Sequence, residues 1–310
     1  MPGARPRPRP VASEPEGGRN VLGLFAYDGS DFKGWQRLPG AQRTVQETLE
    51  LALASLGSQA CNAIGAGRSD AGVHAEGQAA NFRPGDERPL TELGAALNAL
   101  LPPDLRCLAL REAVPNFHAR YRAVSKRYAY RLLPESGGDG GGRSVMGAVK
   151  AWRAYSLALR GRLDRRAMDE ALATLLGRRS FRALTNAKAD ARGFERELSI
   201  ATAEAADPFI DLIFEADGFL YNQARLMAAA VLACGQGRLR PAALAKALAS
   251  GDRAALPGAL GAYGLRLVSV GFRDEDFFGP WEPVGGCEPG AFLSGAALGL
   301  RASGRPASGR

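Results

Sequence analysis

Hydrophobic residues in this chain alternate between the spacing of a strand and the spacing of a helix, and they do so in the same order twice. In each half the order is strand, helix, strands, helix and strand, without a close repeat of the sequence itself. This order is typical of the α+β class. We therefore expect two similar α+β halves, each with helices on one face of a mixed, mainly antiparallel sheet.

In the first half we expect strands at 20–27, 61–65, 78–82 and 106–113, and helices at 44–56 and 90–101. Thr44 and Glu47 form a capping-box pattern at the start of the first helix. In the second half we expect strands at 126–133, 197–204 and 209–215, a helix capped by Asp164, and a helix from about 219 to 234.

The less periodic segments set the predicted domain boundaries. The Pro/Arg-rich residues 1–18 are expected to form a disordered tail, and the Gly-rich residues 136–142 a flexible loop. After the tail we place an N-terminal domain at 19–124 and a C-terminal domain at 125–275, which contains the Gly-rich loop. An extension at 276–310, disordered at its end, follows.

Composition limits the classes of function. A net charge of +8 over 310 residues is weak evidence for a nucleic-acid partner. No apolar run approaches the ~20 residues that span a bilayer, so we expect no membrane association. Four cysteines without a CxxC pair and only two histidines argue against a metal site. We expect a cytoplasmic protein, unless the N-terminal tail directs import into an organelle.

The most unusual stretch is GAGRSDAGVHAEGQAANF at 65–82, where glycines and other small residues surround Arg68 and Asp70. One interpretation is a glycine-rich turn with a solvated aspartate. A dinucleotide-binding loop is excluded, because Asp70 stands where the third glycine belongs and would repel a pyrophosphate. The chain also lacks the GxxxxGK[ST] phosphate loop, so we expect no nucleotide cofactor.

Arg225 is the only charged residue between 218 and 237. A buried, unpaired guanidinium costs several kcal/mol. Arg225 therefore either reaches solvent from the start of its helix or pairs with a carboxylate in a cleft, for which Asp70 is the candidate.

Basic and aromatic side chains interleave in FHARYRAVSKRYAYR at 117–131. This mixture suits phosphate contacts combined with stacking on unpaired bases. The alternative is core packing of the aromatics, with solvated arginines on the opposite face.

Together these segments resemble the tRNA pseudouridine synthase A family. The resemblance covers roughly residues 20–273 and rests on segments that occur in the family's order. They are YDGSDFKGWQ at 27–36, VQE at 45–47, GRSDAGVHAEGQAANF at 67–82, FHARY at 117–121, KRYAYR at 126–131, GFLYNQARLM at 218–227 and YGLRLVSV at 263–270.

The resemblance implies the pseudouridine synthase fold, with a positively charged catalytic cleft between the halves, and a homodimer that binds tRNA. It implies no cofactor and no metal. Asp70 matches the catalytic aspartate, Arg68 the arginine that enters the RNA helix beside the flipped nucleotide, Tyr128 the active-site tyrosine, and Arg225 the partner of the aspartate. Further candidate RNA contacts are His74, Gln78, Phe117, His118, Arg120, Lys126, Arg127 and Asn222.

The implied reaction is isomerisation of uridine to pseudouridine in the anticodon stem-loop, at tRNA positions 38–40. Attack of Asp70 at C1′, attack at C6, and an elimination route all remain open. The rival hypothesis is a tRNA-binding or RNA-folding protein whose catalysis is vestigial. Three positions depart from the family pattern. Ser69 replaces a threonine and keeps its hydroxyl, Asn222 stands where a histidine is common, and Ala224 stands where a larger apolar residue is usual.

Overall fold

A computed structural model of the protein describes residues 18–40, 42–58, 62–134, 154–186, 193–206 and 208–285. Residues 1–17 of the predicted tail at 1–18, the Gly-rich loop and the end of the chain lie outside these ranges. Within them, no helix has the length and apolar character that crossing a membrane requires.

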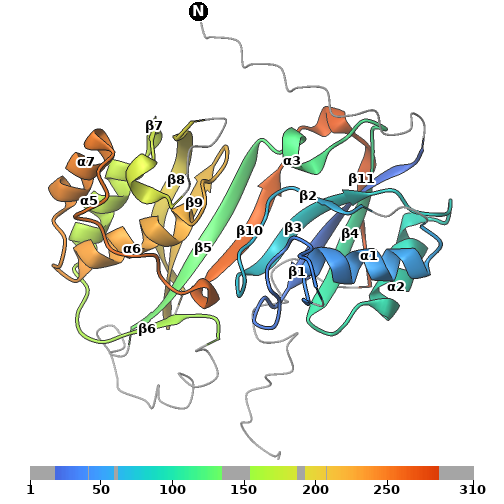
Figure 1. Ribbon diagram of the computed structural model, residues 1–310, viewed down its shortest axis with the longest axis horizontal. Helices are drawn as coiled ribbons and strands as arrows, with labels where there is room; N and C mark the ends of the chain where they lie inside the picture. The colour runs from blue at the N-terminus through green and yellow to red at the C-terminus, as the bar shows by residue number, and fades with distance from the viewer. Residues whose placement is uncertain are drawn as a thin grey trace, which may run out of the picture.

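Two groups of elements follow one another along the chain (Figure 1). The first group comprises β1 (Asn20–Tyr27), α1 (Val45–Ser55), β2 (Ile64–Gly65), β3 (His74–Phe82), α2 (Leu90–Leu100), β4 (Leu105–Ala113) and α3 (Ala119–Arg122). The second comprises β5 (Ser125–Pro134), β6 (Leu157–Leu159), α5 (Arg165–Leu175), β7 (Gly177–Ser180), β8 (Glu195–Ala206), β9 (Phe209–Ala216), α6 (Gln223–Gly235), α7 (Pro241–Ser250), β10 (Leu265–Gly271) and β11 (Phe277–Pro283).

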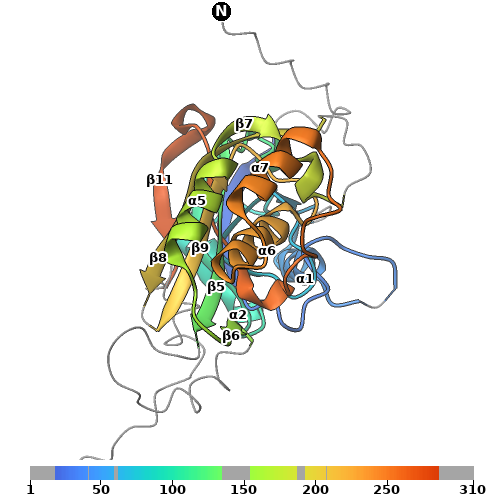
Figure 2. The same ribbon diagram turned by 90° about the vertical axis from the view of Figure 1, so that its left-hand side faces the viewer.

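The described strands form one sheet in the order β11-β4-β1-β3-β10-β5-β9-β8-β7, with β2 beside β3 and β6 beside β5. Its pairings are antiparallel except β3 with β10 and β5 with β6. The longer helices lie on one face of this sheet, α1 and α2 over the first half and α5, α6 and α7 over the second (Figures 1 and 2). The predicted α+β class, with a mixed and mainly antiparallel sheet, is therefore confirmed.

The two halves share this sheet because β10 lies between them. Arg266 and Leu267 of β10 pair in parallel with β3, and the other edge of β10 pairs antiparallel with β5. Sequence periodicity predicted two halves but not a sheet that continues across both. The boundary at 124/125 stays a prediction, since the sheet crosses it.

Most predicted elements are confirmed, and so are two predicted helix caps. Thr44 Oγ1 accepts from the N–H of Glu47 at 3.4 Å, and Asp164 Oδ1 accepts from the N–H of Ala167 at 3.0 Å. The helix predicted from 219 begins only at Gln223, because Asn222 has a left-handed backbone with φ 59°. Periodicity did not predict α7, or β11, whose pairing with β4 shifts register between Phe278 and Glu282.

Candidate active site

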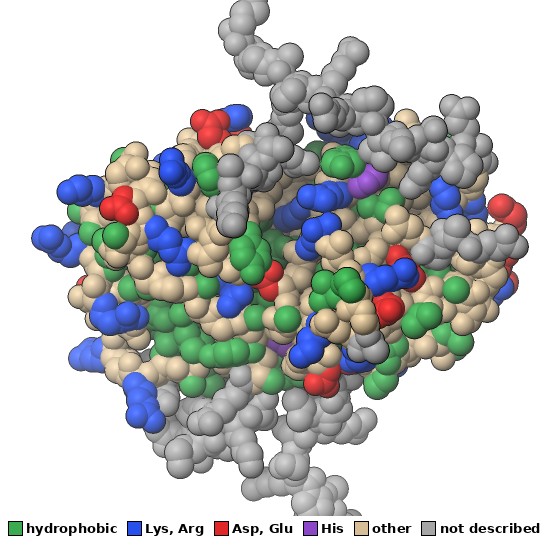
Figure 3. Space-filling view, viewed as in Figure 1, with side chains coloured by type: hydrophobic (Ala, Val, Ile, Leu, Met, Phe, Trp, Pro, Cys, Tyr) green, Lys and Arg blue, Asp and Glu red, His purple; other side chains and the backbone are tan. Residues whose placement is uncertain are grey.

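A cleft with a volume of about 1870 Å³ lies where the halves meet, and both contribute to its lining. In the space-filling view, Lys and Arg side chains gather around the hollow between the two groups of helices (Figure 3). Phosphate groups favour such a surface, because each cation can replace a counterion of the nucleic acid.

The loop that carries Asp70 connects β2 to β3. Hydrogen bonds from the end of β1 and from the segment that follows it hold this loop in place. The Tyr27 hydroxyl lies 2.8 Å from Ser69 Oγ, and the Trp35 N–H donates to the Ser69 carbonyl at 3.1 Å. Gly34 has φ +97°, and a Cβ there would lie 2.7 Å from the Ser69 carbonyl oxygen. The glycine therefore allows the close approach of two backbones that positions Asp70.

Asp70 forms an ion pair across the cleft with Arg225 of α6. Arg225 Nη1 lies 3.3 Å from Asp70 Oδ2, and the side chains are 19% and 33% exposed respectively. Arg225 also donates to the Leu260 carbonyl at 2.7 Å and to Asn222 Oδ1 at 3.0 Å. The hypothesis that Arg225 pairs with Asp70 is confirmed, and the carboxylate keeps an open side toward the cleft.

Asn222 precedes α6 and sets the position of Arg225. Among the described residues it is the only non-glycine with positive φ. Asparagine tolerates this left-handed conformation better than most residues. The next residue, Gln223, is buried, and its Oε1 accepts from the Leu220 N–H at 2.7 Å. Hydrogen bonds therefore hold the turn on both sides of Asn222.

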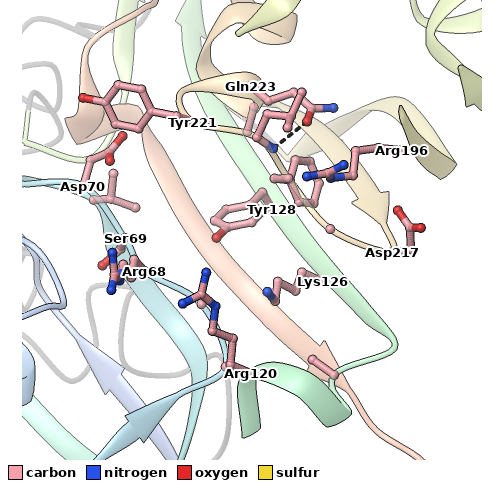
Figure 4. Close-up of a pocket in the computed structure, with 18 of the residues that line it drawn as sticks. Arg68, Ser69, Asp70, Arg120, Lys126, Tyr128, Arg196, Asp217, Tyr221 and Gln223 are labelled. Atoms are coloured by element: carbon pink, nitrogen blue, oxygen red, sulfur yellow. Dashed lines mark hydrogen bonds between the residues drawn. The ribbon is translucent and has the colours of Figure 1, made fainter. Parts of the chain in front are cut away.

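Tyr128 of β5 also lines the cleft that contains Asp70 and Arg225, and Figure 4 shows it there. Its side chain is 8% exposed, and its ring lies edge-on to Phe219 with centroids 4.9 Å apart. Burial raises the pKa of Tyr128 far above its ordinary value, and neighbouring Tyr27 and Asp70 add to the shift. The side chain is therefore a neutral phenol at physiological pH.

Three cations predicted from the sequence line the cleft: Arg68, Arg120 and Lys126. Arg68 and Arg120 are exposed, and neither forms an ion pair with another residue of the described ranges. Lys126 shares a strand face with Tyr128 and lies against Gly67, where a Cβ would be 3.2 Å from Nζ. Figure 4 shows the three side chains in the cleft together with Asp70 and Tyr128.

Two other candidates, His118 and Asn222, also line the cleft, whereas His74 and Gln78 lie buried behind it. His74 Nε2 is 3.0 Å from the Ala154 carbonyl, and Nδ1 is 3.2 Å from Asp28 Oδ1. Gln78 Nε2 donates to the Gly67 carbonyl at 3.0 Å. Gln78 therefore supports the Asp70 loop, whereas His74 is bonded to residues outside this loop, and contact of either with RNA stays a prediction.

The remaining candidates, Phe117 and Arg127, are also outside the cleft lining. Phe117 is buried against Phe272 and Phe277, at centroid distances of 5.4 and 5.1 Å. Arg127 points to the opposite face of the sheet, where its Nε lies 2.7 Å from Glu215 Oε2. Alternation along β5 places Lys126 and Arg127 on opposite faces.

The cleft also contains residues that the sequence analysis did not assign, among them Tyr121 and Tyr221. Both rings are largely exposed, at 46% and 57%. Tyr221 directly precedes Asn222, so a signal existed: an aromatic next to a residue already assigned to the site. No three His, Cys, Asp or Glu side chains in the described part of the chain form a metal-ligand group.

An aspartate–arginine pair in a basic cleft between two α+β halves defines a site for chemistry on a polyanion. Residues 24–122 and 171–273 match a family model described as tRNA pseudouridine synthase. The chain therefore belongs to the tRNA pseudouridine synthase family.

Three relatives that match this chain over nearly their full length are each named tRNA pseudouridine synthase A. The protein from Moorella thermoacetica is 38% identical over 247 residues, which cover 79% of this chain and 96% of the relative. The protein from Chromobacterium violaceum is 38% identical, with 83% and 94% covered. The protein from Thermus thermophilus is 37% identical, with 83% and 98% covered.

Proposed function

We propose that this protein isomerises uridine to pseudouridine in tRNA, with Asp70 as the nucleophile. The observation that carries the proposal is the Asp70 carboxylate, held by Arg225 yet open to a basic cleft. Membership of the family supports the reaction, and the names of the relatives support tRNA as the substrate.

The reaction breaks the bond between C1′ and N1 of uridine and forms a bond between C1′ and C5. The uracil turns in between, C5 loses its proton, and N1 gains one, so no electrons are gained or lost. A carboxylate serves each route that remains open: displacement of uracil at C1′ with cleavage of the C1′–N1 bond, addition to C6, or elimination of uracil from the sugar. In all of them Arg225 fixes the orientation of Asp70 and balances its charge.

Tyr128 is proposed to pack against the target uracil. Its buried position and raised pKa support a neutral phenol, which stacks and donates a hydrogen bond. Removing the C5 proton as a phenolate would first require ionising a group that its surroundings keep protonated.

Arg68 is proposed to occupy the space that the target nucleotide leaves. Flipping a base out of a stem costs a few kcal/mol, and filling the gap offsets part of this cost. Arg68 is exposed, beside Asp70 in the chain, and without an ion-pair partner in the described ranges, which supports this role. Arg120 and Lys126 are proposed to contact phosphates further along the cleft.

Several finer points rest on the family resemblance. The proposed targets are uridines at positions 38–40, on the 3′ side of the anticodon stem-loop. The proposed assembly is a homodimer, which light scattering coupled to size-exclusion chromatography tests. The proposed location is the cytoplasm, where tRNA is available, and fractionation of cells tests it.

The decisive experiment is tritium release from unmodified tRNA that carries uridine labelled at C5. We expect release by the wild-type protein without added cofactor or metal, and none by the Asp70→Asn variant although it still binds tRNA. Release by both proteins would refute the role of Asp70. Release by neither, with tight tRNA binding by both, would favour the vestigial binding protein.

A further inference from the structure

The ring of Tyr221 lies in the cleft between the two halves and is exposed there, which is unusual for a large aromatic side chain. Most of its surface is open, with 57% exposed, although the residue lines the cleft. Its hydroxyl and its ring have no hydrogen-bond or ring partner among the described residues. Nothing in the fold therefore requires an aromatic side chain at this position.

The backbone of Tyr221, in contrast, is held firmly. Its carbonyl accepts from Thr185 Oγ1 at 3.0 Å and from the Asn186 N–H at 3.4 Å. The next residue is Asn222, whose side chain bonds Arg225, which in turn pairs with Asp70. The ring thus projects from the same rigid turn that positions the nucleophile, so the backbone at Tyr221 loses little entropy when a ligand covers the ring.

From this geometry we infer that Tyr221 forms a second base-stacking subsite, which takes the nucleobase next to the target uridine. The inference rests on the proposed function, because it requires RNA in the cleft. Figure 4 shows the Tyr221 ring near Asp70 and apart from Tyr128. One base cannot stack on both rings, so the target uracil occupies Tyr128 and its neighbour in the strand occupies Tyr221.

The ligand of this subsite is an unpaired or unstacked nucleobase of any type. When the target leaves the helix, the adjoining base loses a stacking partner, and an aromatic ring replaces it. Such stacking tolerates all four bases, because each has a π-face, and alanine substitution typically weakens binding by roughly 5- to 100-fold. The subsite would therefore add affinity without restricting the neighbouring sequence.

Tyr121 is the matched control on the other half of the protein. It also lines the cleft and is 46% exposed, but its ring already lies 4.2 Å from that of His118. Tyr121→Ala therefore removes a comparable exposed aromatic that has a partner within the protein.

The test is a binding series with tRNA transcripts that each carry one abasic nucleotide in the anticodon stem-loop. All proteins contain Asp70→Asn, so that the RNA is not converted. With intact tRNA, we expect Tyr221→Ala to bind roughly 5- to 100-fold more weakly than its parent, and Tyr221→Phe to bind like it. For one position beside the target uridine, we expect the tRNA with an abasic nucleotide there to bind the parent more weakly than intact tRNA does. Tyr221→Ala should bind this abasic tRNA and intact tRNA with equal affinity.

Tyr121→Ala should still respond to the abasic nucleotide at that position as the parent does. The inference is overturned if Tyr221→Ala binds intact tRNA normally, or if every abasic position weakens Tyr221→Ala and its parent equally. Failure of the proposed function is separate: the wild-type protein would then release no tritium from labelled tRNA, whatever the binding series gives.

Discussion

The two faces of the central sheet use arginine in opposite ways. On the cleft face, Arg68 and Arg120 are exposed and have no ion-pair partner in the described ranges. On the opposite face, Arg131 and Arg266 share the carboxylate of Asp211, and Arg266 also lies 2.8 Å from Glu76. These four side chains are at most 17% exposed, so their charges interact at low local dielectric.

The difference separates arginines that we propose to bind RNA from those that hold the protein together. Glu76, Arg266, Arg131 and Asp211 come from β3, β10, β5 and β9, so this charged cluster crosses the junction between the halves. A positive charge in the sequence therefore predicts an RNA contact only when its strand face is known. Substitutions on the two sides of this division should therefore have different effects.

Arg266→Ala should lower the free energy of unfolding by about 3–5 kcal/mol, because it leaves Asp211 and Glu76 buried with less compensation. Urea denaturation followed by circular dichroism measures the loss. Arg120→Ala is the control from the cleft face and should stay within about 0.5 kcal/mol of wild type. Equal losses in the two variants would contradict the division.

Arg225→Ala should reduce kcat by about a hundredfold, the typical cost of misplacing a reacting group. Arg225→Lys should fall between this variant and wild type. A lysine keeps the charge but cannot bond Asp70, Asn222 and Leu260 together. Single-turnover tritium release measures the rate, and a lysine variant as slow as the alanine variant would argue against a charge requirement.

Asp211→Asn should cost about 2 kcal/mol of stability at neutral pH. Burial alone raises the pKa of Asp211, but hydrogen bonds from Arg131 and Arg266 and their charges outweigh it and lower the net pKa. The lowered pKa stabilises the fold above the ordinary value of about 4, and this contribution is lost as pH falls further. The difference in free energy of unfolding between wild type and the variant, measured from unfolding curves at pH values from 7 to 3, should therefore become smaller as the pH falls.

Arg120→Ala should weaken tRNA binding a few-fold and reduce the slope of log affinity against log salt by about 0.7. Arg127→Ala is the matched comparison, since its guanidinium pairs with Glu215 on the opposite face. We expect Arg127→Ala to leave both affinity and slope unchanged. A reduced slope for Arg127→Ala would instead show that Arg127 contacts the RNA.

Local patterns in the sequence predicted most elements and the central ion pair. The strands expected at 20–27 and 106–113 were located within a residue, because short, mainly apolar runs of this kind are typical of strands that are buried on both faces. The isolation of Arg225 in an apolar helix led to Asp70, because a buried guanidinium requires a nearby carboxylate.

Features that depend on tertiary contacts could not be read from local patterns. Phe117 and Arg127 lie in a basic and aromatic segment that suits RNA, yet the fold uses them for packing and for an ion pair. The left-handed turn at Asn222 shortened the predicted helix, and residue type alone does not tell when an asparagine adopts this conformation. The sequence analysis did not assign Tyr221, because the exposure of its ring depends on how the chain folds around the cleft.

The position of β10 in the chain has a consequence for synthesis on the ribosome. This strand lies in the middle of the sheet, yet among the described strands only β11 follows it in the sequence. Until residues 265–271 emerge, the edges of β3 and β5 that they join keep unpaired backbone groups, which are prone to pair with other chains. The nascent protein therefore passes through a stage with two open edges, and Asp70 meets Arg225 only when translation of this region is complete.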